Sequence, residues 1–360
     1  MRILNFYIGR QVVVGSLLAT LVLLTLLNFF SFADELGELG EGDYGIGEIV
    51  LYLTLTSPRN FYELMPSGAL LGSLVMLGAL ANNRELVAMQ AAGVSRSRII
   101  WSALRGGLLL AVVTALIGEY VAPVSEQTAT TMKAAALRQQ VASRTKYGFW
   151  LRDNDRNVFI NIRQIERPEN LGDINIFELN QYGRLQSATH ADKAVYDGAK
   201  WRLESLNTTR FEANDVLRPE RKAGADWSSV LAPDLLNAFV IRPENLSAVD
   251  LMTYIEYLRE NGQKSLLVEQ AFWGRIVNPL VTIVMMLVAM PLVLGFRRDV
   301  SAGQRIMLGA TLGIGFYLFD KVFGHLGLIY EMDPLFSSAF PALFALAAAL
   351  LGLLQGRRAG

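Results

Sequence analysis

Hydrophobic residues in this chain gather in long runs separated by short polar loops. Two of these runs carry internal charges, Ala103–Pro123 and Ile306–Tyr330. Four others are uncharged and long enough to cross a bilayer core, which requires about 20 helical residues: Gln11–Ala33, Leu64–Asn83, Ile276–Phe296 and Pro334–Gly356. The pattern therefore predicts an α-helical membrane protein with six spanning helices.

The loops between these runs alternate in charge. The loop after the first run is acidic from Asp34 to Glu48, whereas the loop after the second carries Arg84, Arg96 and Arg98. Arginine and lysine accumulate in cytoplasmic loops. We therefore expect both termini in the cytoplasm and the long segment between runs three and four outside it. The first run exceeds the length of a signal-peptide core, so we interpret it as a retained span.

The long segment, residues 139–245, changes to a strand pattern. Val158, Ile160 and Ile162 alternate with other residues, and so do Trp201 and Leu203. Alternation with a period of two places such side chains on one face of a sheet. Asp197-Gly198 lies between two of these runs and suits a tight hairpin. The pattern predicts an all-β, jelly-roll-like domain outside the cytoplasm.

A connecting helix is predicted after this domain, over residues 246–262. Ser247 is its expected N-cap, and Leu251, Ile255 and Leu258 fall on one helical face. That face packs either on the β domain or at the membrane interface. The predicted organisation is helices one to three in 1–138, the β domain in 139–245, this connecting helix, and helices four to six in 263–360.

Composition narrows the class of protein. Hydrophobic residues make up 52% of the chain, charged residues 18%, and the formal net charge is zero, which gives no support for nucleic-acid binding. There is no cysteine, so thiol catalysis and thiolate metal sites are excluded. The two histidines, His190 and His325, fall in segments too far apart to share a site. No catalytic motif is present, and we expect neither a cofactor nor an enzyme.

The cytoplasmic loop between spans two and three contains a short helical pattern. An asparagine cap, a helix-forming run and Gly93 predict two to three turns over about 84–93, with Leu86, Met89 and Gln90 along one side. A short helix on the membrane surface fits a groove on a cytosolic partner. An ordinary interspan turn is the alternative.

The same segment carries a resemblance to a known family. Glu85-Leu86-Val87-Ala88-Met89-Gln90-Ala91-Ala92-Gly93, together with Met65–Gly72, Gly118–Pro123 and Tyr317–Asp320, resembles the lipopolysaccharide-export permeases LptF and LptG, and LptG more closely. The resemblance covers nearly the whole chain. It implies a subunit of an ABC transporter in the inner membrane, with a periplasmic β domain. The implied partners are a paralogous permease (LptF), the dimeric cytosolic ATPase LptB, LptC and periplasmic LptA.

The resemblance also implies roles for individual residues. Docking on the ATPase would involve the 84–93 helix, with Arg84, Glu85, Leu86, Met89 and Gly93. Lipid phosphates would meet Lys133 and Arg138, whereas a solvated or snorkelling role is the alternative for both. Residues in span five would border the lipid path, with helix packing as the alternative: Phe316, Tyr317, Phe319 and Asp320. The first-span positions that are basic in relatives are Ser31, Gly37 and Glu38 here, which weakens a phosphate contact there.

The resemblance also implies the function, and the energy that lipid extraction needs supports it. Each buried CH₂ contributes about 0.8 kcal/mol, so a multi-chain lipid leaves the bilayer only with an external energy source. The chain has no G-x-x-x-x-G-K-[ST] phosphate loop, so a partner must hydrolyse ATP. We expect a permease that extracts lipopolysaccharide from the outer leaflet of the inner membrane. The alternatives are the LptF paralogue, a scaffold that relays ATPase motion without moving lipid, and an envelope-lipid-modifying enzyme.

Overall fold

The computed structural model describes residues 2–137, 149–153, 157–167, 169–198, 200–211, 217–227, 242–295 and 301–358. It divides into two compact units. The helical unit comprises residues 1–37, 53–126 and 269–360, and the second unit comprises residues 38–52 and 127–268. The second unit contains the β-sheet, and each unit is described separately below.

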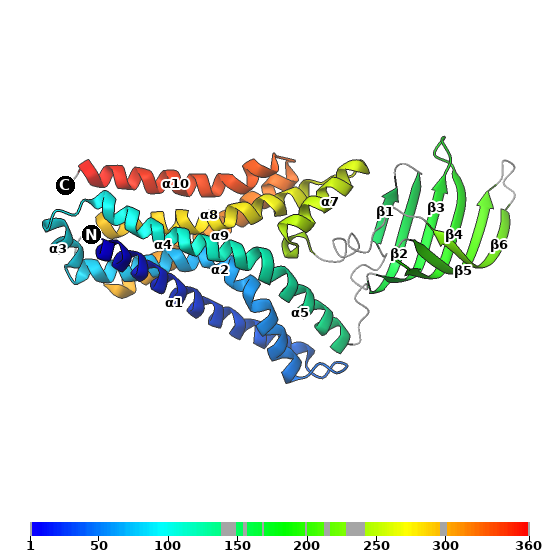
Figure 1. Cartoon of the computed structure of the whole chain (residues 1–360), viewed down its shortest axis with the longest axis horizontal. Helices are drawn as coiled ribbons and strands as arrows, with labels where there is room; N and C mark the ends of the chain where they lie inside the picture. The colour runs from blue at the N-terminus through cyan, green and yellow to red at the C-terminus, as the bar shows by residue number, and fades with distance from the viewer. Residues whose placement is uncertain are drawn as a thin grey trace. The chain divides into compact units, whose positions relative to one another are not determined.

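The described residues include six long apolar helices, as the sequence predicts. They include α1 (Arg2–Glu35), α2 (Ile46–Asn82), α4 (Arg96–Leu116), α8 (Leu266–Gly295), α9 (Ala302–Ile329) and α10 (Pro334–Arg358). The helix α1 extends beyond its uncharged run at both ends, and α2 and α8 begin well before theirs. With 34 residues at 1.5 Å each, α1 is about 51 Å long, which exceeds a bilayer core of about 30 Å. In the helical unit, the start of α1 and the end of α10 lie at the same end (Figure 1).

The third span continues past the residue at which we expected it to end. After α4, the π-helical turn η2 (Ile117–Val121) leads directly into α5 (Ala122–Ala136), so Pro123 lies inside a continuous helical segment. Proline cannot donate the usual backbone hydrogen bond and so disrupts a regular helix. The π turn changes the bonding pattern just before Pro123, and the Arg275 side chain donates to the Gly118 carbonyl within it. The proline is therefore accommodated without ending the helix.

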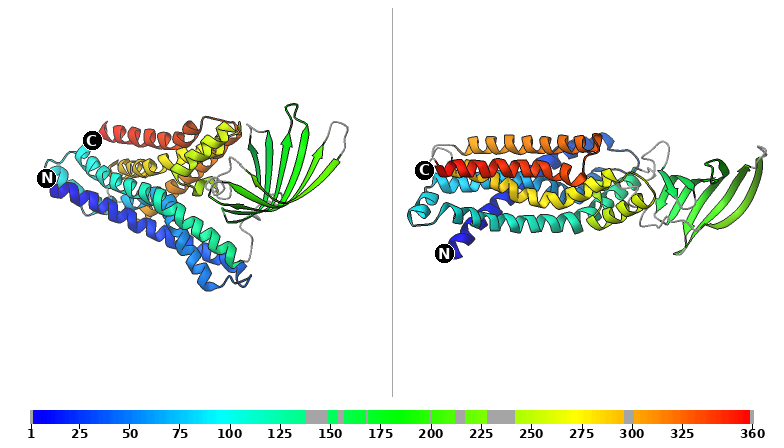
Figure 2. Two further views of the ribbon diagram at one scale, coloured as in Figure 1. Left: turned by 45° about the vertical axis from the view of Figure 1, so that its right-hand side comes forward. Right: turned by 90° about the horizontal axis from the view of Figure 1, so that it is seen from above.

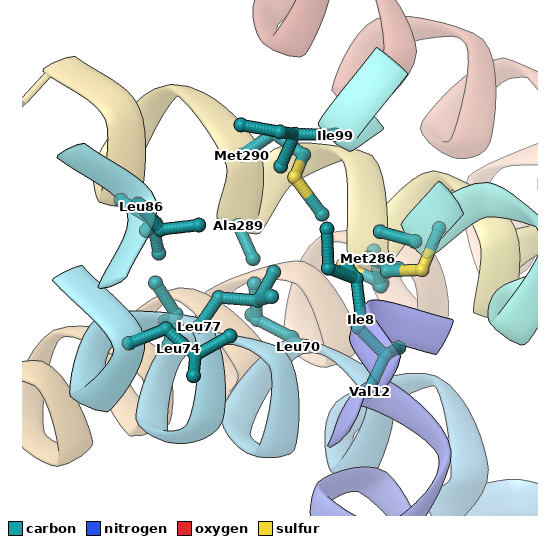
Figure 3. Packing of buried hydrophobic residues seen from close by; sticks show 14 of the residues in the cluster. Ile8, Val12, Leu70, Leu74, Leu77, Leu86, Ile99, Met286, Ala289 and Met290 are labelled. Atoms are coloured by element: carbon teal, nitrogen blue, oxygen red, sulfur yellow. The ribbon is translucent and has the colours of Figure 1, made fainter. Parts of the chain in front are cut away.

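The core of the helical unit is formed by buried residues from five spans, α1, α2, α4, α8 and α10, and from one short helix. Ile8 and Val12 of α1, Leu74 of α2, and Met286 of α8 are all buried in it, together with Leu86 of α3 (Glu85–Ala91). Figure 3 shows these side chains meeting in one cluster. Burial of this apolar surface fixes the short helix α3 against the ends of the spans.

The β domain contains one antiparallel sheet with strands in chain order. Its strands are β1 (Phe149–Asp153), β2 (Val158–Arg167), β3 (Asn170–Leu179), β4 (Leu185–Tyr196), β5 (Trp201–Phe211) and β6 (Leu217–Trp227). The sheet is strongly curved (Figure 2). The all-β prediction is confirmed. Every pairing among the described strands joins chain neighbours, an order that the sequence alone did not fix.

The predicted alternation agrees with the burial of side chains in this sheet. Ile160, Ile162 and Trp201 are buried on one face, whereas Arg202 and Glu204 are exposed. Asp197 and Lys200 close the β4–β5 hairpin through two hydrogen bonds. Gly198 within this turn has a φ of +96°, which a residue with a side chain rarely adopts.

The helix α7 (Ala248–Glu260) follows the 3₁₀ turn η3 (Pro243–Asn245). Ser247 is its N-cap and accepts a hydrogen bond from the Asp250 backbone N–H. Leu251, Ile255 and Leu258 are buried, as the helical spacing predicts. The helix belongs to the second unit.

Candidate functional site

The segment between α2 and α4 makes two sharp turns around a seven-residue helix. The first turn is at Arg84, the N-cap of α3, with a left-handed φ of 62°. The second is at Gly93, with a φ of +86°. Ser95 then caps α4 by accepting from the Arg98 N–H. The predicted helix is present, but the expected asparagine cap is wrong: Arg84 holds the N-cap position and makes no side-chain cap bond.

The two sides of α3 differ in burial. Leu86 is buried in the helical core, and Met89 packs against that core while remaining half-buried. Arg84, Val87 and Gly93 are exposed. The side predicted from Leu86 and Met89 therefore anchors α3 to its own chain, and the opposite side is accessible to another molecule.

Glu85 makes a polar contact with the first span. The Tyr7 hydroxyl donates a 2.9 Å hydrogen bond to the Glu85 carboxylate (Oε2), across 78 positions of sequence. Tyr7 itself packs partly against the helical core. Tyr7 could not be predicted from the sequence, because a single tyrosine near the start of an apolar run has no pattern that marks a polar role.

A second polar contact reaches this segment from α9. The Arg305 guanidinium (Nη2) donates a 2.8 Å hydrogen bond to the Asn82 side-chain oxygen, at the end of α2. A Cβ on Gly78 would collide with the Arg305 side chain, so the glycine makes room for it. No local pattern around Arg305 predicts this contact. The contacts from Tyr7 and Arg305 connect α3 and the turn before it to α1 and α9.

Lys133 lies in a cluster within the second unit. Its ammonium is 2.9 Å from the Glu38 carboxylate and lies over the rings of Tyr44 and Tyr52, at 5.6 Å and 5.0 Å from their centroids. Only 20% of the Lys133 side chain is exposed. A lipid phosphate would have to compete with Glu38 for this cation. Arg138 lies outside the described residues.

The predicted residues of span five lie on different sides of α9. Phe316 packs against the helical core. Tyr317 is 49% exposed, and the Lys321 ammonium lies 5.6 Å from its ring centroid. Asp320 is half-buried. Phe319 contacts a ring cluster formed with Phe323 of α9 and with α10, through Phe340 and Phe344. Among the four, Tyr317 is the most accessible to a ligand.

Metal chemistry finds no structural support in the described ranges. Across these ranges, no group of three or more histidine and acidic side chains is placed to hold an ion. The arrangement instead combines a helix at the end of the spans, exposed on one side and anchored on the other, with accessible apolar helices, and it defines a multi-pass membrane protein.

Comparison with known proteins identifies the family. The model of the lipopolysaccharide export system permeases LptF/LptG matches residues 6–355. The chain is 35% identical to the "Lipopolysaccharide export system permease protein LptG" of Haemophilus influenzae, over 94% of this chain and 95% of that protein. It is 33% identical to the protein of the same name from Escherichia coli, over 94% of each. The chain therefore belongs to the LptF/LptG family of lipopolysaccharide export permeases, as the resemblance implied. It is a transporter component, which agrees with the predicted class.

Proposed function

We propose that this chain is the LptG-type subunit of an ABC transporter and extracts lipopolysaccharide from the outer leaflet of the inner membrane. A cytosolic ATPase would supply the force at α3, and the β domain would receive the lipid in the periplasm. The proposed partners are an LptF-type permease, an LptB-type ATPase dimer, LptC and LptA. The observation that carries the proposal is the unequal burial of the spans.

The spans differ in how much apolar surface the chain itself covers. Within an 18-residue apolar stretch of each span, 61% of the α2 residues are buried but only 22% in α1, 11% in α9 and 22% in α10. Helices that are apolar all round and poorly covered contact lipid or another protein. Three such helices in one chain are what a permease needs to form a lipid cavity with a second subunit.

Orientation is supported by charge and by the arrangement of the helical unit. The start of α1, the helix α3 and the end of α10 lie at one end of that unit (Figure 1). Arginines gather in the same connections, including Arg84 and Arg96. Cytoplasmic loops are enriched in arginine, so we assign this end to the cytoplasm, where an ATPase operates.

The accessible side of α3 is the proposed docking surface. Arg84 and Val87 are exposed there, while Leu86 and Met89 hold the helix in place from behind. Glu85, bonded to Tyr7, lies where force on α3 would pass to α1. Leu86 and Met89 therefore support docking indirectly, through the position of the helix.

The proposed lipid contacts involve a cation and an aromatic surface. Lys133 would bind a lipid phosphate after exchange of its Glu38 partner. Tyr317, on the poorly covered helix α9, would contact acyl chains. Phe316 and Phe319 would act by holding α9 against the core and α10.

The test is a charge reversal with a matched control. In the complex purified from cells and reconstituted in vesicles, Glu85→Lys should abolish co-purification of the ATPase and ATP-driven release of lipopolysaccharide. Glu256→Lys makes the same change at an exposed position of α7 and should affect neither. If the Glu85→Lys complex still co-purified with the ATPase and still released lipopolysaccharide, docking at α3 would be refuted.

A further inference from the structure

The crossing of α1 and α4 leaves an open groove beside it. The two helices meet where Gly9 faces Gly106: a Cβ on Gly106 would lie 2.7 Å from the Gly9 carbonyl oxygen. The Ser102 hydroxyl donates a 2.9 Å hydrogen bond to the Asn5 side-chain oxygen at the same crossing. The adjacent groove has a volume of about 420 Å³.

The groove has apolar walls and two cations. Phe6, Val13 and Leu109 line it, and Phe6 and Leu109 are 72% and 55% exposed. Arg10 of α1 and Arg105 of α4 line the same groove, and both side chains are exposed. A long apolar surface with charges beside it matches the two parts of a phospholipid, its acyl chain and its headgroup.

The charges of this groove are not balanced within the chain. In the part of the chain that the structure describes, the side chains of Arg10 and Arg105 have no hydrogen bond or ion pair. Other arginines at this end of the helical unit do have partners, as Arg305 has Asn82. Snorkelling toward water would explain one unpaired arginine on a lipid-facing helix, but two from different helices at one groove call for an anion between them.

We propose that this groove binds an anionic phospholipid of the cytoplasmic leaflet. Arg10 and Arg105 hold the phosphate, because guanidinium groups bind phosphate oxygens bidentately, and an acyl chain lies along Phe6, Val13 and Leu109. Basic pockets between spans on the cytoplasmic side bind anionic headgroups in this way. The inference rests on the orientation in the proposed function, and the ligand differs from the cargo, which is placed in the opposite leaflet.

Charge selects the class of lipid. A zwitterionic headgroup brings its own cation to a site that already holds two, whereas the net negative charge of phosphatidylglycerol complements them. Each basic side chain near a membrane surface strengthens anionic lipid binding by about fivefold. Substitution of both arginines should therefore weaken binding by about thirtyfold.

The experiment measures retained lipid without ATP or lipopolysaccharide, so its outcome does not depend on transport. The full chain, with the subunits that accompany it, is placed in nanodiscs of phosphatidylglycerol and phosphatidylcholine, and bound lipids are counted by native mass spectrometry. The parent protein should retain phosphatidylglycerol preferentially. Arg10→Gln/Arg105→Gln should lose this preference, and Arg10→Lys/Arg105→Lys should retain part of it.

Matched controls separate the site from general charge effects. Arg96→Gln removes one positive charge from the same helix α4 outside the groove and should leave the preference intact, with thermal unfolding recorded for every variant. Equal retention of both lipids by the parent, or unchanged retention by the double glutamine variant, would overturn the proposal. A photo-crosslinker at Leu109 that captured a partner helix instead of lipid would overturn it as well.

Discussion

The Tyr7 hydroxyl donates its hydrogen bond to Glu85, the acidic residue in the first turn of α3. The contact joins the first span to the helix that we propose as the ATPase dock. Glu85 is therefore not an isolated surface charge. In the proposed function, a partner that binds α3 would either preserve this bond or exchange it for one of its own, and the bond is a route by which force on α3 would reach α1.

Tyr7→Phe removes the hydroxyl and preserves the ring packing. A hydrogen bond in a half-exposed position contributes about 1 kcal/mol, and we expect ATP-driven lipopolysaccharide release to fall by about two- to fivefold. ATPase co-purification should remain, since the exposed side of α3 is unchanged. Release per ATP hydrolysed in reconstituted vesicles measures the effect. Tyr182→Phe makes the same change at an exposed turn and should match the parent; equal release from both variants would exclude a role for the bond.

The local sequence predicted the helix α3 but not which of its sides packs against the core. A helix-forming run and Gly93 indicate where the helix lies, because these signals act over a few residues. Which side faces inward depends on Leu86 meeting the core that the distant spans form. The left-handed Arg84 is likewise imposed by the packing on both sides of the turn, since no local signal favours it over the asparagines before it.

The fold shows the same difference between features set by local sequence patterns and features set by contacts between distant segments. Hydropathy predicted the six spans because membrane crossing depends on the length of a single apolar run. Hydropathy wrongly placed the end of the third span at Pro123. The Arg275 side chain, which bonds to the Gly118 carbonyl and helps the helix continue past this proline, comes from a helix far along the chain. Alternation predicted the strands of the β domain, yet strand order depends on which edges pair, which periodicity does not encode.

A Glu38 variant tests whether Lys133 exchanges this carboxylate for a lipid phosphate. Glu38→Gln removes the competing charge, so lipopolysaccharide should be retained more tightly, by up to about fivefold, because ion pairs with exposed partners contribute no more than about 1 kcal/mol. Lys133→Gln should weaken retention. Binding to the purified complex is measured by titration, with Glu256→Gln of α7 as the control in the same unit. Weaker retention in Glu38→Gln would instead show that the pair serves only to hold the second unit together.

Two neighbouring aromatic residues on α9 should respond differently to truncation. Phe319→Ala removes a ring that contacts Phe323, Phe340 and Phe344, and it should lower the free energy of unfolding by about 2 kcal/mol, somewhat less than for a fully buried ring. Tyr317→Ala should leave stability unchanged, because half of the side chain is exposed, and should reduce lipopolysaccharide cross-linking to α9. Thermal unfolding and cross-linking yield measure the two effects. The reverse pattern would assign lipid contact to Phe319.

The crossing of α1 and α2 depends on glycine at a contact between backbones. A Cβ on Gly72 would overlap the backbone of Gly15, and a Cβ on Gly15 would lie 2.8 Å from the Gly72 carbonyl oxygen. Neither backbone can rotate away as a side chain can, so Gly72→Ala must separate the helices. Overpacking of this kind destabilises by about 1–3 kcal/mol, occasionally more.

Gly274→Ala supplies the control, since that glycine lies within α8 and has no atom within 4 Å of the added Cβ. Alanine favours a helix by up to about 1 kcal/mol over glycine, so this variant should unfold at the parent temperature or above it, while Gly72→Ala unfolds below. Thermal unfolding in detergent compares them. A Gly72→Ala protein as stable as the Gly274→Ala protein would mean that α1 is free to move away from α2. In that case, force applied at α3 would reach α1 through Tyr7 and the shared core without support from the crossing with α2.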